Sequence, residues 1–183
     1  MNIYLKAFLG LLVVAFFSVS LTSKADDLDL ENTLYLDLIY GRVVIKMFPD
    51  VAPNHVSKIK KLTRDGYYDG SIFHRVIEGF MAQVGAPKGE ISGGTGELLD
   101  AEFSELSHYK GMVSMARPGD INAADSQFFI LTAYVPGLDG EYTIWGEVVS
   151  GMRYVDKIKL GEGPDFKNPD IIIKMQLAAD VIK

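Results

Sequence analysis

One arginine lies inside an otherwise apolar segment, and its setting suggests chemistry that depends on a fixed positive charge. The segment runs from Phe73 to Gln83. If it forms a strand, alternation places Phe73, Arg75 and Ile77 on one side. A charge on an apolar face is costly unless that face opens to a ligand. Arg75 is therefore a candidate for binding or catalysis, and the alternative is that it snorkels to solvent or pairs with a carboxylate.

Most other kinds of catalytic chemistry are excluded by composition or lack a motif. The sequence has no Cys, which excludes disulfides, thiolate metal sites and cysteine nucleophiles. The glycine cluster at 93–96 lacks the Lys-Ser/Thr ending of a phosphate loop and is predicted to be a turn. There is no Gly-x-Ser-x-Gly elbow, and His55, His74 and His108 lack the spacing of metal ligands. We therefore expect no metal and no cofactor.

The strands that would position Arg75 are short and numerous. Leu34, Leu36 and Leu38 alternate with more polar residues, and a second β-rich run follows at 43–47, which together predict a hairpin. Further β-rich runs are predicted at 71–77, 80–84, 111–115, 127–131, 143–149 and 171–177. A short helical pattern lies near 152–158. Many short, mostly antiparallel strands with only two helices favour a closed barrel or a sandwich over a parallel α/β sheet.

The first of the two predicted helices is amphipathic. Pro53 marks its start, and Gly66 is expected to end it. Its apolar side consists of Val56, Ile59 and Leu62. His55 and Lys58 fall outside that side, where solvation is expected. His74 lies in a strand pattern, where a hydrogen-bonded structural role is favoured over metal binding or proton transfer.

Length and composition indicate one ordinary domain. The chain has 183 residues, of which 48% are hydrophobic and 23% charged, which argues against disorder and against a polytopic membrane protein. The formal net charge is −6 and no basic block is visible. Binding to nucleic acid is therefore not expected. A monomer is expected, because the pattern does not call for a large apolar surface.

The N-terminus has the three parts of a secretory signal peptide. Lys6 precedes the apolar run 7–17, which gives way to small and polar residues ending at Ala25. The alternative is an uncleaved membrane anchor, but the uncharged stretch is shorter than the roughly 20 residues of a comfortable span. We expect a signal peptide at 1–25 and an exported domain at 26–183, periplasmic rather than secreted to the medium, with no membrane association after cleavage.

The segment around Arg75 resembles the signature of the cyclophilins, the cyclosporin-binding class of peptidyl-prolyl cis–trans isomerases. The similarity continues, in the right order, over nearly the whole chain after residue 32. The segments that carry it are Phe73 to Gln83, Gly94-Thr95-Gly96, Ala101-Glu102-Phe103, Met115-Ala116-Arg117, Asp125 to Ile130 and Leu138-Asp139-Gly140. The resemblance implies a mainly β fold, a closed eight-stranded antiparallel β-barrel capped by two α-helices. The loops are similar to those of bacterial exported members.

The resemblance also implies roles for particular residues. Arg75 would donate to the proline nitrogen as the amide twists, and Gln83 would orient Arg75 and the substrate carbonyl. Phe80, Met81, Phe129 and Leu138 would line a pocket for the proline ring. Ala116, Gln127 and the backbone of Arg117 would position the flanking peptide, and Tyr142 would pack on the ligand. From spacing alone, the apolar members of this set are better explained as barrel core, and only the combined order of the motifs reverses that preference.

The function implied is acceleration of rotation about X-Pro bonds in unfolded or partly folded proteins during export, without covalent chemistry. The alternative is a non-catalytic module or holdase chaperone that binds proline-containing segments in the same groove. Arg75 favours catalysis, since a pure binder could replace it. The position before Leu138, commonly Trp in cyclosporin-sensitive members, is Gly137. We therefore expect only weak binding of cyclosporin A. The usual Gly-Asp after Gln83 is also changed, which leaves the shape of the 84–96 loop open.

Overall fold

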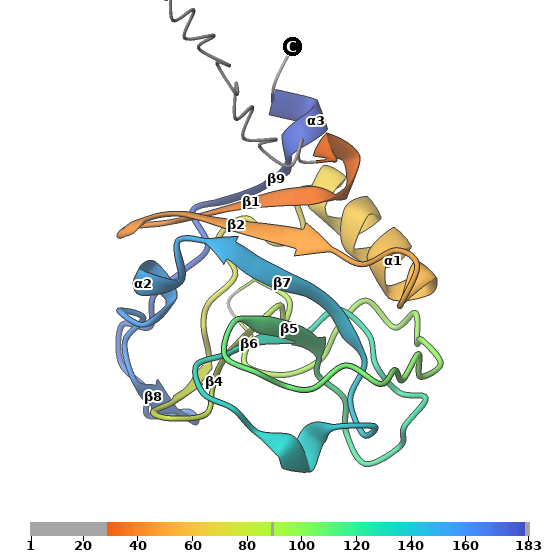
Figure 1. Cartoon of the computed structure of the whole chain (residues 1–183). Helices are drawn as coiled ribbons and strands as arrows, with labels where there is room; N and C mark the ends of the chain where they lie inside the picture. The colour runs from red at the N-terminus through yellow and green to blue at the C-terminus, as the bar shows by residue number, and fades with distance from the viewer. Residues whose placement is uncertain (1–28, 89, 182–183) are drawn as a thin grey trace, which may run out of the picture.

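Nine antiparallel strands form one curled sheet around an apolar core (Figure 1). The structure, a computed structural model, describes residues 29–88 and 90–181. The strands are β1 (Thr33–Leu38), β2 (Gly41–Met47), β3 (Arg75–Ile77), β4 (Met81–Val84), β5 (Met112–Met115), β6 (Phe128–Leu131), β7 (Ile144–Ser150), β8 (Gly161–Glu162) and β9 (Lys174–Leu177). The helices are α1 (Pro53–Arg64), α2 (Met152–Val155) and α3 (Ala178–Val181), with single 3₁₀ turns η1 (Leu30–Asn32) and η2 (Pro136–Leu138).

The mainly β, antiparallel class predicted from the sequence is confirmed, but the closed eight-stranded barrel is not. The sheet runs in the order β8-β3-β4-β6-β5-β7-β2-β1-β9, which leaves β8 and β9 as edges. The ends of the sheet approach each other ahead of β3 and β9, where Ile72 and Ile171 form an isolated bridge. The extra strand β8 has only two residues and pairs with β3, so no periodicity could have revealed it.

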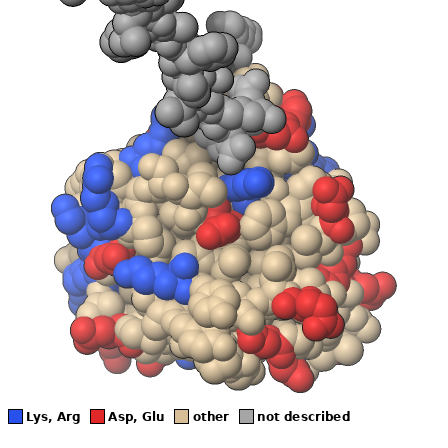
Figure 2. Space-filling view, viewed as in Figure 1, with Lys and Arg blue, Asp and Glu red and all other residues tan. Residues whose placement is uncertain are grey.

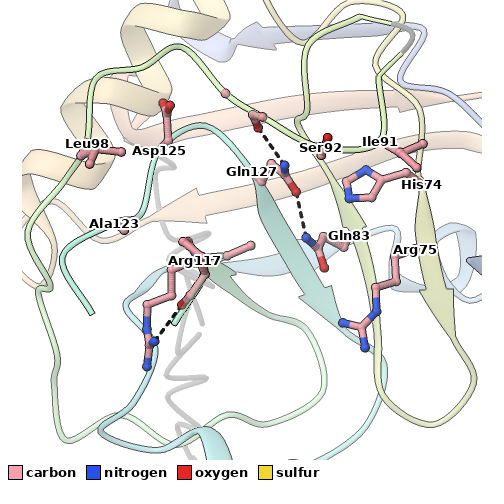
Figure 3. Close-up of a pocket in the computed structure, with 14 residues that line it drawn as sticks. His74, Arg75, Gln83, Ile91, Ser92, Leu98, Arg117, Ala123, Asp125 and Gln127 are labelled. Carbon is pink, nitrogen blue, oxygen red and sulfur yellow. Dashed lines mark hydrogen bonds between the residues drawn. The ribbon is translucent and has the colours of Figure 1, made fainter. Parts of the chain in front are cut away.

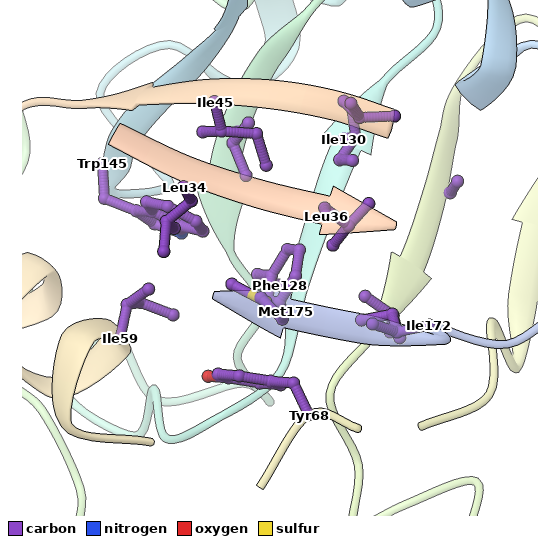
Figure 4. Close-up of a cluster of buried hydrophobic side chains, with 14 of the residues drawn as sticks. Leu34, Leu36, Ile45, Ile59, Tyr68, Phe128, Ile130, Trp145, Ile172 and Met175 are labelled. Atoms are coloured by element: carbon purple, nitrogen blue, oxygen red, sulfur yellow. The ribbon is translucent and has the colours of Figure 1, made fainter. Parts of the chain in front are cut away.

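The core fills the inside of the curl, and the predicted β1–β2 hairpin supplies one wall of it (Figure 4). Leu34, Leu36 and Ile45 are fully buried, as the alternation predicts. Phe128 meets the ring of Trp145 edge to face at 5.4 Å between centroids and packs against Tyr68 at 5.5 Å. These aromatic contacts fix β6 from the inside and leave its outer face for another use.

Helix α1 covers one side of the sheet, against β9, and α2 lies at β2 on another side (Figure 1). Pro53 is at the helix start and the left-handed Gly66, with φ of 71°, follows its end, as predicted. The predicted solvation of His55 and Lys58 is wrong. Their exposed fractions are 0% and 8%. Each side chain points from α1 to a carboxylate on a distant loop, which a helical wheel cannot show.

His55 contacts Glu102, which caps the start of α1 from outside the helix. The carboxylate of Glu102 accepts from the backbone N–H of Asn54 at 3.0 Å and of His55 at 3.0 Å, and lies 2.6 Å from Nδ1 of His55. This arrangement replaces the side-chain cap that Ala52 cannot provide. Burial lowers the pKa of His55 despite its hydrogen bond to the Glu102 carboxylate, so the imidazole is neutral at pH 7.

Charges of both signs are spread over the surface. In Figure 2, basic side chains gather on the side of α2, and acidic side chains predominate on the side of α1. No helix within the described ranges is long and apolar enough to cross a bilayer. The predicted signal peptide at 1–25 lies outside the described residues.

Candidate functional site

A row of side chains crosses three neighbouring strands and starts at Arg75. In the β3–β4 ladder Arg75 lies opposite Gln83, and in the β4–β6 ladder Gln83 lies opposite Phe129. Residues directly opposite on antiparallel strands share a face of the sheet. The same registers place Ile77 opposite Met81, one step along the strands. Strand pairing therefore places five side chains next to one another on one face of the sheet: Arg75, Ile77, Met81, Gln83 and Phe129.

The predicted grouping of Phe73 with Arg75 and Ile77 is wrong. The strand begins only at Arg75, and Phe73 is fully buried in the main core. Ile77 instead packs against a second, separate cluster built on Met81 and Phe129. The sheet thus has an inner layer inside the curl and a smaller apolar layer outside it. Arg75 belongs to the outer layer, where an open face removes the cost of a buried charge.

The outer layer contains a small cavity of about 90 Å³. Its lining consists of Arg75, Phe80, Met81, Gln83, Ala116, Arg117, Phe129, Leu138 and Tyr142. These are nine of the ten site residues predicted from the sequence. They come from the three strands β3, β4 and β6 and from three connecting segments, β3–β4, β5–β6 and β6–β7. Met81 and Phe129 form a dry floor, with exposed fractions of 1% and 5%. We call this cavity the proline pocket.

Arg75 stands at the edge of the proline pocket with part of its guanidinium unused. Its Nε donates to Oε2 of Glu162 on β8 at 3.0 Å. Its terminal nitrogens donate no hydrogen bond to any residue that the structure describes. The guanidinium carbon lies 5.8 Å from the centre of the Phe80 ring. The side chain is 40% exposed. Two amino groups are therefore free to donate to a ligand in the pocket.

Arg117 braces the opposite wall of the proline pocket. Its guanidinium lies over the ring of Tyr142 at 4.7 Å and donates to the carbonyl oxygen of Glu141 at 2.9 Å. It also donates to the carbonyl oxygens of Pro118 and Gly119. The Tyr142 ring in turn meets an aromatic floor residue, Phe129, edge to face at 5.8 Å. The family resemblance implies a backbone role here, and the side chain adds a structural one.

A larger cavity of about 510 Å³ adjoins the proline pocket. The two share Arg75, Gln83, Ala116 and Arg117, and the larger one is otherwise lined by His74, Ile91, Ser92, Gly93, Gly94, Leu98, Pro118, Ala123, Asp125 and Gln127. Gln127, the tenth predicted site residue, therefore lies in this cavity. We call it the loop cavity, because most of its walls come from segments outside helices and strands.

A chain of amide contacts links the two cavities (Figure 3). Nε2 of Gln83 donates to Oε1 of Gln127 at 2.9 Å, and Nε2 of Gln127 donates to the carbonyl oxygen of Gly93 at 2.8 Å. This relay fixes which end of the Gln83 amide faces the proline pocket. The Gln83 oxygen is left free to accept a hydrogen bond, and the orientation of the Gln83 amide depends on the loop at Gly93.

Several lining residues of the loop cavity were not predicted to be functional. Ile91 and Leu98 lie in irregular chain, where periodicity gives no signal, and Asp125 was quoted only as part of the resemblance. His74 was expected to be hydrogen-bonded in a structural role. It is 6% exposed and its Nδ1 has no partner among the described residues. Burial lowers its pKa, so a neutral ring forms part of the cavity wall.

The comparisons with known proteins agree with this geometry. The family model described as cyclophilin type peptidyl-prolyl cis-trans isomerase/CLD matches residues 33–177. The chain belongs to this family. It is accordingly an enzyme of the peptidyl-prolyl cis–trans isomerase class. Residues 29–88 and 90–181 contain no group of three or more His, Asp or Glu side chains placed to hold a metal ion.

Particular relatives share most of the chain. It is 47% identical to a probable peptidyl-prolyl cis-trans isomerase of Brucella suis, over 89% of this chain and 91% of the relative. It is 37% identical to peptidyl-prolyl cis-trans isomerase B of Bacillus subtilis, over 67% and 86%. A cyclophilin of Hirschia baltica superposes with a TM-score of 0.75 at 29% identity, covering 84% of this chain and 76% of that one. A cyclophilin-type isomerase of Cryptosporidium parvum, crystallised in the presence of the dipeptide Ala-Pro, gives 0.72 at 29%, covering 79% and 98%.

Proposed function

We propose that Arg75 accelerates rotation about X-Pro bonds by donating to the proline nitrogen as the amide twists. The planar amide has a barrier of about 18–20 kcal/mol, which comes from resonance. In the twisted state the nitrogen becomes pyramidal and regains a basic lone pair. A donor that reaches this nitrogen stabilises the twisted state more than the planar one. The supporting observation is that both terminal nitrogens of Arg75 are free of the described residues at the edge of the pocket.

The proline ring is proposed to sit on the dry floor of the proline pocket. Met81, Phe129 and Leu138 offer apolar contact, and the volume of about 90 Å³ suits a small ring rather than a long side chain. The peptide on one side of the proline would then cross Ala116 into the loop cavity. That the Cryptosporidium parvum relative was crystallised with Ala-Pro supports a proline-containing ligand.

The proposed catalysis needs more than one hydrogen bond. An acceleration of about 100,000-fold corresponds to about 7 kcal/mol, whereas one hydrogen bond to a charged group contributes about 1.5–3 kcal/mol. Gln83 is proposed to hold the substrate through its side-chain amide. One N–H of this amide is fixed on Gln127, so its second N–H is left to donate to the substrate carbonyl and its oxygen is left to accept from a substrate N–H. The remainder comes from holding the peptide in a conformation close to the twisted state.

Glu162 has a supporting role in this proposal. It holds Nε of Arg75 by a hydrogen bond of 3.0 Å across the β3–β8 ladder, so the guanidinium is oriented before substrate arrives. Both side chains are substantially exposed, at 40% and 58%. The ion pair itself therefore adds little to stability.

The biological setting is proposed to be the folding of exported proteins in the periplasm. The support is the signal-peptide pattern of residues 1–25. Expression of the full chain followed by N-terminal sequencing of the protein recovered from the periplasmic fraction tests this. A protein that begins at Asp26 agrees with the proposal, and an uncleaved chain in the membrane fraction contradicts it.

Cis-to-trans rates of a short X-Pro peptide test the role of Arg75. Arg75→Ala is expected to lower kcat/KM at least about tenfold, in line with the loss of a donor to the transition state. Arg75→Lys keeps the positive charge but loses the forked guanidinium, so its kcat/KM is expected to lie between those of the wild type and Arg75→Ala. Glu162→Gln serves as a control that changes the partner of the Arg75 Nε and leaves Arg75 itself in place. Full activity of a folded Arg75→Ala protein would overturn the catalytic role of Arg75. No acceleration by folded wild-type protein would leave the peptide-binding module or holdase as the working function.

A further inference from the structure

The side chain of Asp125 ties the glycine-rich loop to helix α1. Its Oδ1 accepts from Nζ of Lys58 at 2.7 Å and from Oγ1 of Thr95 at 2.5 Å. Its Oδ2 accepts from the backbone N–H of Gly96 at 2.7 Å. Lys58 also donates to the carbonyl oxygen of Glu97. One carboxylate and one ammonium thus hold three consecutive loop residues at once.

This ion pair is shielded from solvent, unlike those that Lys61 and Arg64 make on the same helix. The side chains of Lys58 and Asp125 are 7% and 14% exposed, whereas Arg64 on the same helix is 44% exposed beside Glu31 and Asp180. Partial burial alone would raise the pKa of Asp125, but hydrogen bonds, chiefly from Lys58 and Thr95, lower it overall. The carboxylate is therefore charged throughout the neutral range.

The chain on either side of Asp125 is anchored independently. Before it, Leu99 and Ala124 form an isolated bridge. After it, Ser126 donates to the carbonyl oxygen of Gly85 at 2.8 Å, and its own carbonyl accepts from Tyr68 at 3.0 Å. Removing the Asp125 carboxylate would therefore free Thr95 and Gly96 at the tip of the 93–97 loop, while the chain around Asp125 keeps its own anchors.

The released tip is the part that reaches the site. Gly93 supplies the carbonyl that orients Gln127, and Gly93 and Gly94 line the loop cavity. Gly94 also fits closely against the carboxylate, since a Cβ there would clash with Oδ2 of Asp125. Figure 3 shows Asp125 at the rim of the cavity and Gln127 between the loop and Gln83.

We propose that Asp125, held by Lys58, is a positioning residue that latches the 93–97 loop and thereby sets which peptide side chains the loop cavity accepts. The proposal rests on the proposed function, because it assigns the loop cavity to the chain flanking the proline. The latch does not touch the reacting bond. Its loss therefore changes the binding of extended peptides more than the rate of rotation in the proline pocket.

The test compares two substrates whose reach differs. Blocked Ala-Pro fills only the proline pocket, and a blocked hexapeptide with leucines around a central proline also enters the loop cavity. For Asp125→Ala, kcat/KM for the hexapeptide relative to that for Ala-Pro is expected to fall about tenfold, mainly through KM, as for the loss of a charged hydrogen bond. The side-chain amide signals of Gln127 are expected to shift in NMR spectra.

Two further variants disturb the contacts of Asp125 while keeping its carboxylate. Lys58→Met removes its charge partner, and Gly94→Ala pushes against it. Both are expected to lower the same ratio, and Lys58→Arg is expected to restore most of it. Arg64→Met removes another base from α1, and Gly119→Ala adds a methyl where no atom lies within 4 Å. Both controls are expected to keep the wild-type ratio.

The outcomes separate this inference from the proposed function. An unchanged ratio in Lys58→Met and Gly94→Ala, or equal losses for both peptides, would overturn the latch while leaving an active isomerase. Full activity of Arg75→Ala on both peptides would instead overturn the catalytic role of Arg75. If Asp125→Ala does not fold, the ratios measured for Lys58→Met and Gly94→Ala test the latch in its place.

Discussion

The proline pocket and the loop cavity share one wall but are built from different parts of the chain. The floor of the proline pocket belongs to paired strands, and its residues Met81 and Phe129 are 1% and 5% exposed. The rim of the loop cavity includes Ile91 and Leu98, which are 43% and 63% exposed and lie in irregular chain. Strand pairing fixes the first, and side-chain contacts such as the Asp125 latch fix the second. A pocket fixed by strand pairing suits the chemical step, and a cavity fixed by loop contacts suits the selective binding of the flanking peptide.

The largest effect is expected from damage to the floor of the proline pocket. Phe129→Ala removes a buried ring from β6, which is expected to lower the free energy of unfolding by about 3–5 kcal/mol. It is also expected to lower kcat/KM about 100-fold or more for short and extended peptides alike. Chemical denaturation and rate assays measure both. A loss confined to extended peptides would break the division between the two cavities.

The rim of the proline pocket gives the next largest effect. Wild-type protein is expected to bind cyclosporin A with a Kd above about 1 μM, because Gly137 offers neither an indole contact nor its hydrogen bond. Gly137 is exposed and a Cβ there meets no atom within 4 Å, so the backbone at this position accepts a side chain and Gly137→Trp can be tested. This variant is expected to tighten binding about 10- to 100-fold. Calorimetry measures it, and sub-micromolar binding by the wild type would contradict the account.

Lower pH is expected to weaken the fold through buried histidines. Burial lowers the pKa of His55 and of His74, so the unfolded state binds more protons just below pH 6.5. The free energy of unfolding therefore falls as the pH drops from 7.5 to 5.5, by at most about 1.4 kcal/mol per pH unit for each histidine. Beside His55, the pKa of Glu102 is lowered, so this carboxylate stays charged in the same range.

Denaturation curves at the two pH values check this slope. His55→Gln removes one of the two titrating groups and is expected to show a shallower dependence than the wild type. A slope that does not change in this variant would show that His55 does not carry the effect.

The smallest effect is expected at the outer rim of the loop cavity. Leu98→Ser changes a side chain that is 63% exposed, so the free energy of unfolding is expected to move by less than about 0.5 kcal/mol. KM for the leucine hexapeptide is expected to rise about two- to threefold through lost apolar contact. An equal rise for blocked Ala-Pro would argue that Leu98 acts on the proline pocket instead.

The same contrast explains what could be predicted from the sequence. The β1–β2 hairpin and α1 follow from alternation and helical spacing, and both were found. Nine of the ten predicted site residues line the proline pocket, and strand registers bring four of them together: Arg75, Met81, Gln83 and Phe129. Those residues came from the family resemblance. Spacing alone favoured barrel core for the apolar ones.

What could not be predicted depends on contacts between distant loops. His55 and Lys58 look solvated on a helical wheel, yet they pair with Glu102 and Asp125, which lie 47 and 67 residues further along the chain. The edge strand β8, with two residues, has no period of its own. The closed eight-stranded form followed from the resemblance and is replaced by a nine-stranded sheet with two edges.

The central claim is that Arg75 catalyses rotation of a proline bound in the pocket, and exchange NMR tests it most directly. The spectra follow the cis and trans signals of a saturating X-Pro peptide, while the signals of Met81 and Leu138, which line the proline pocket, report binding. Uncatalysed exchange takes tens to hundreds of seconds. The account predicts fast exchange with the wild-type protein. With Arg75→Ala, it predicts that the peptide still binds while exchange slows at least about tenfold. Wild-type binding without exchange, or undiminished exchange in Arg75→Ala, would contradict it.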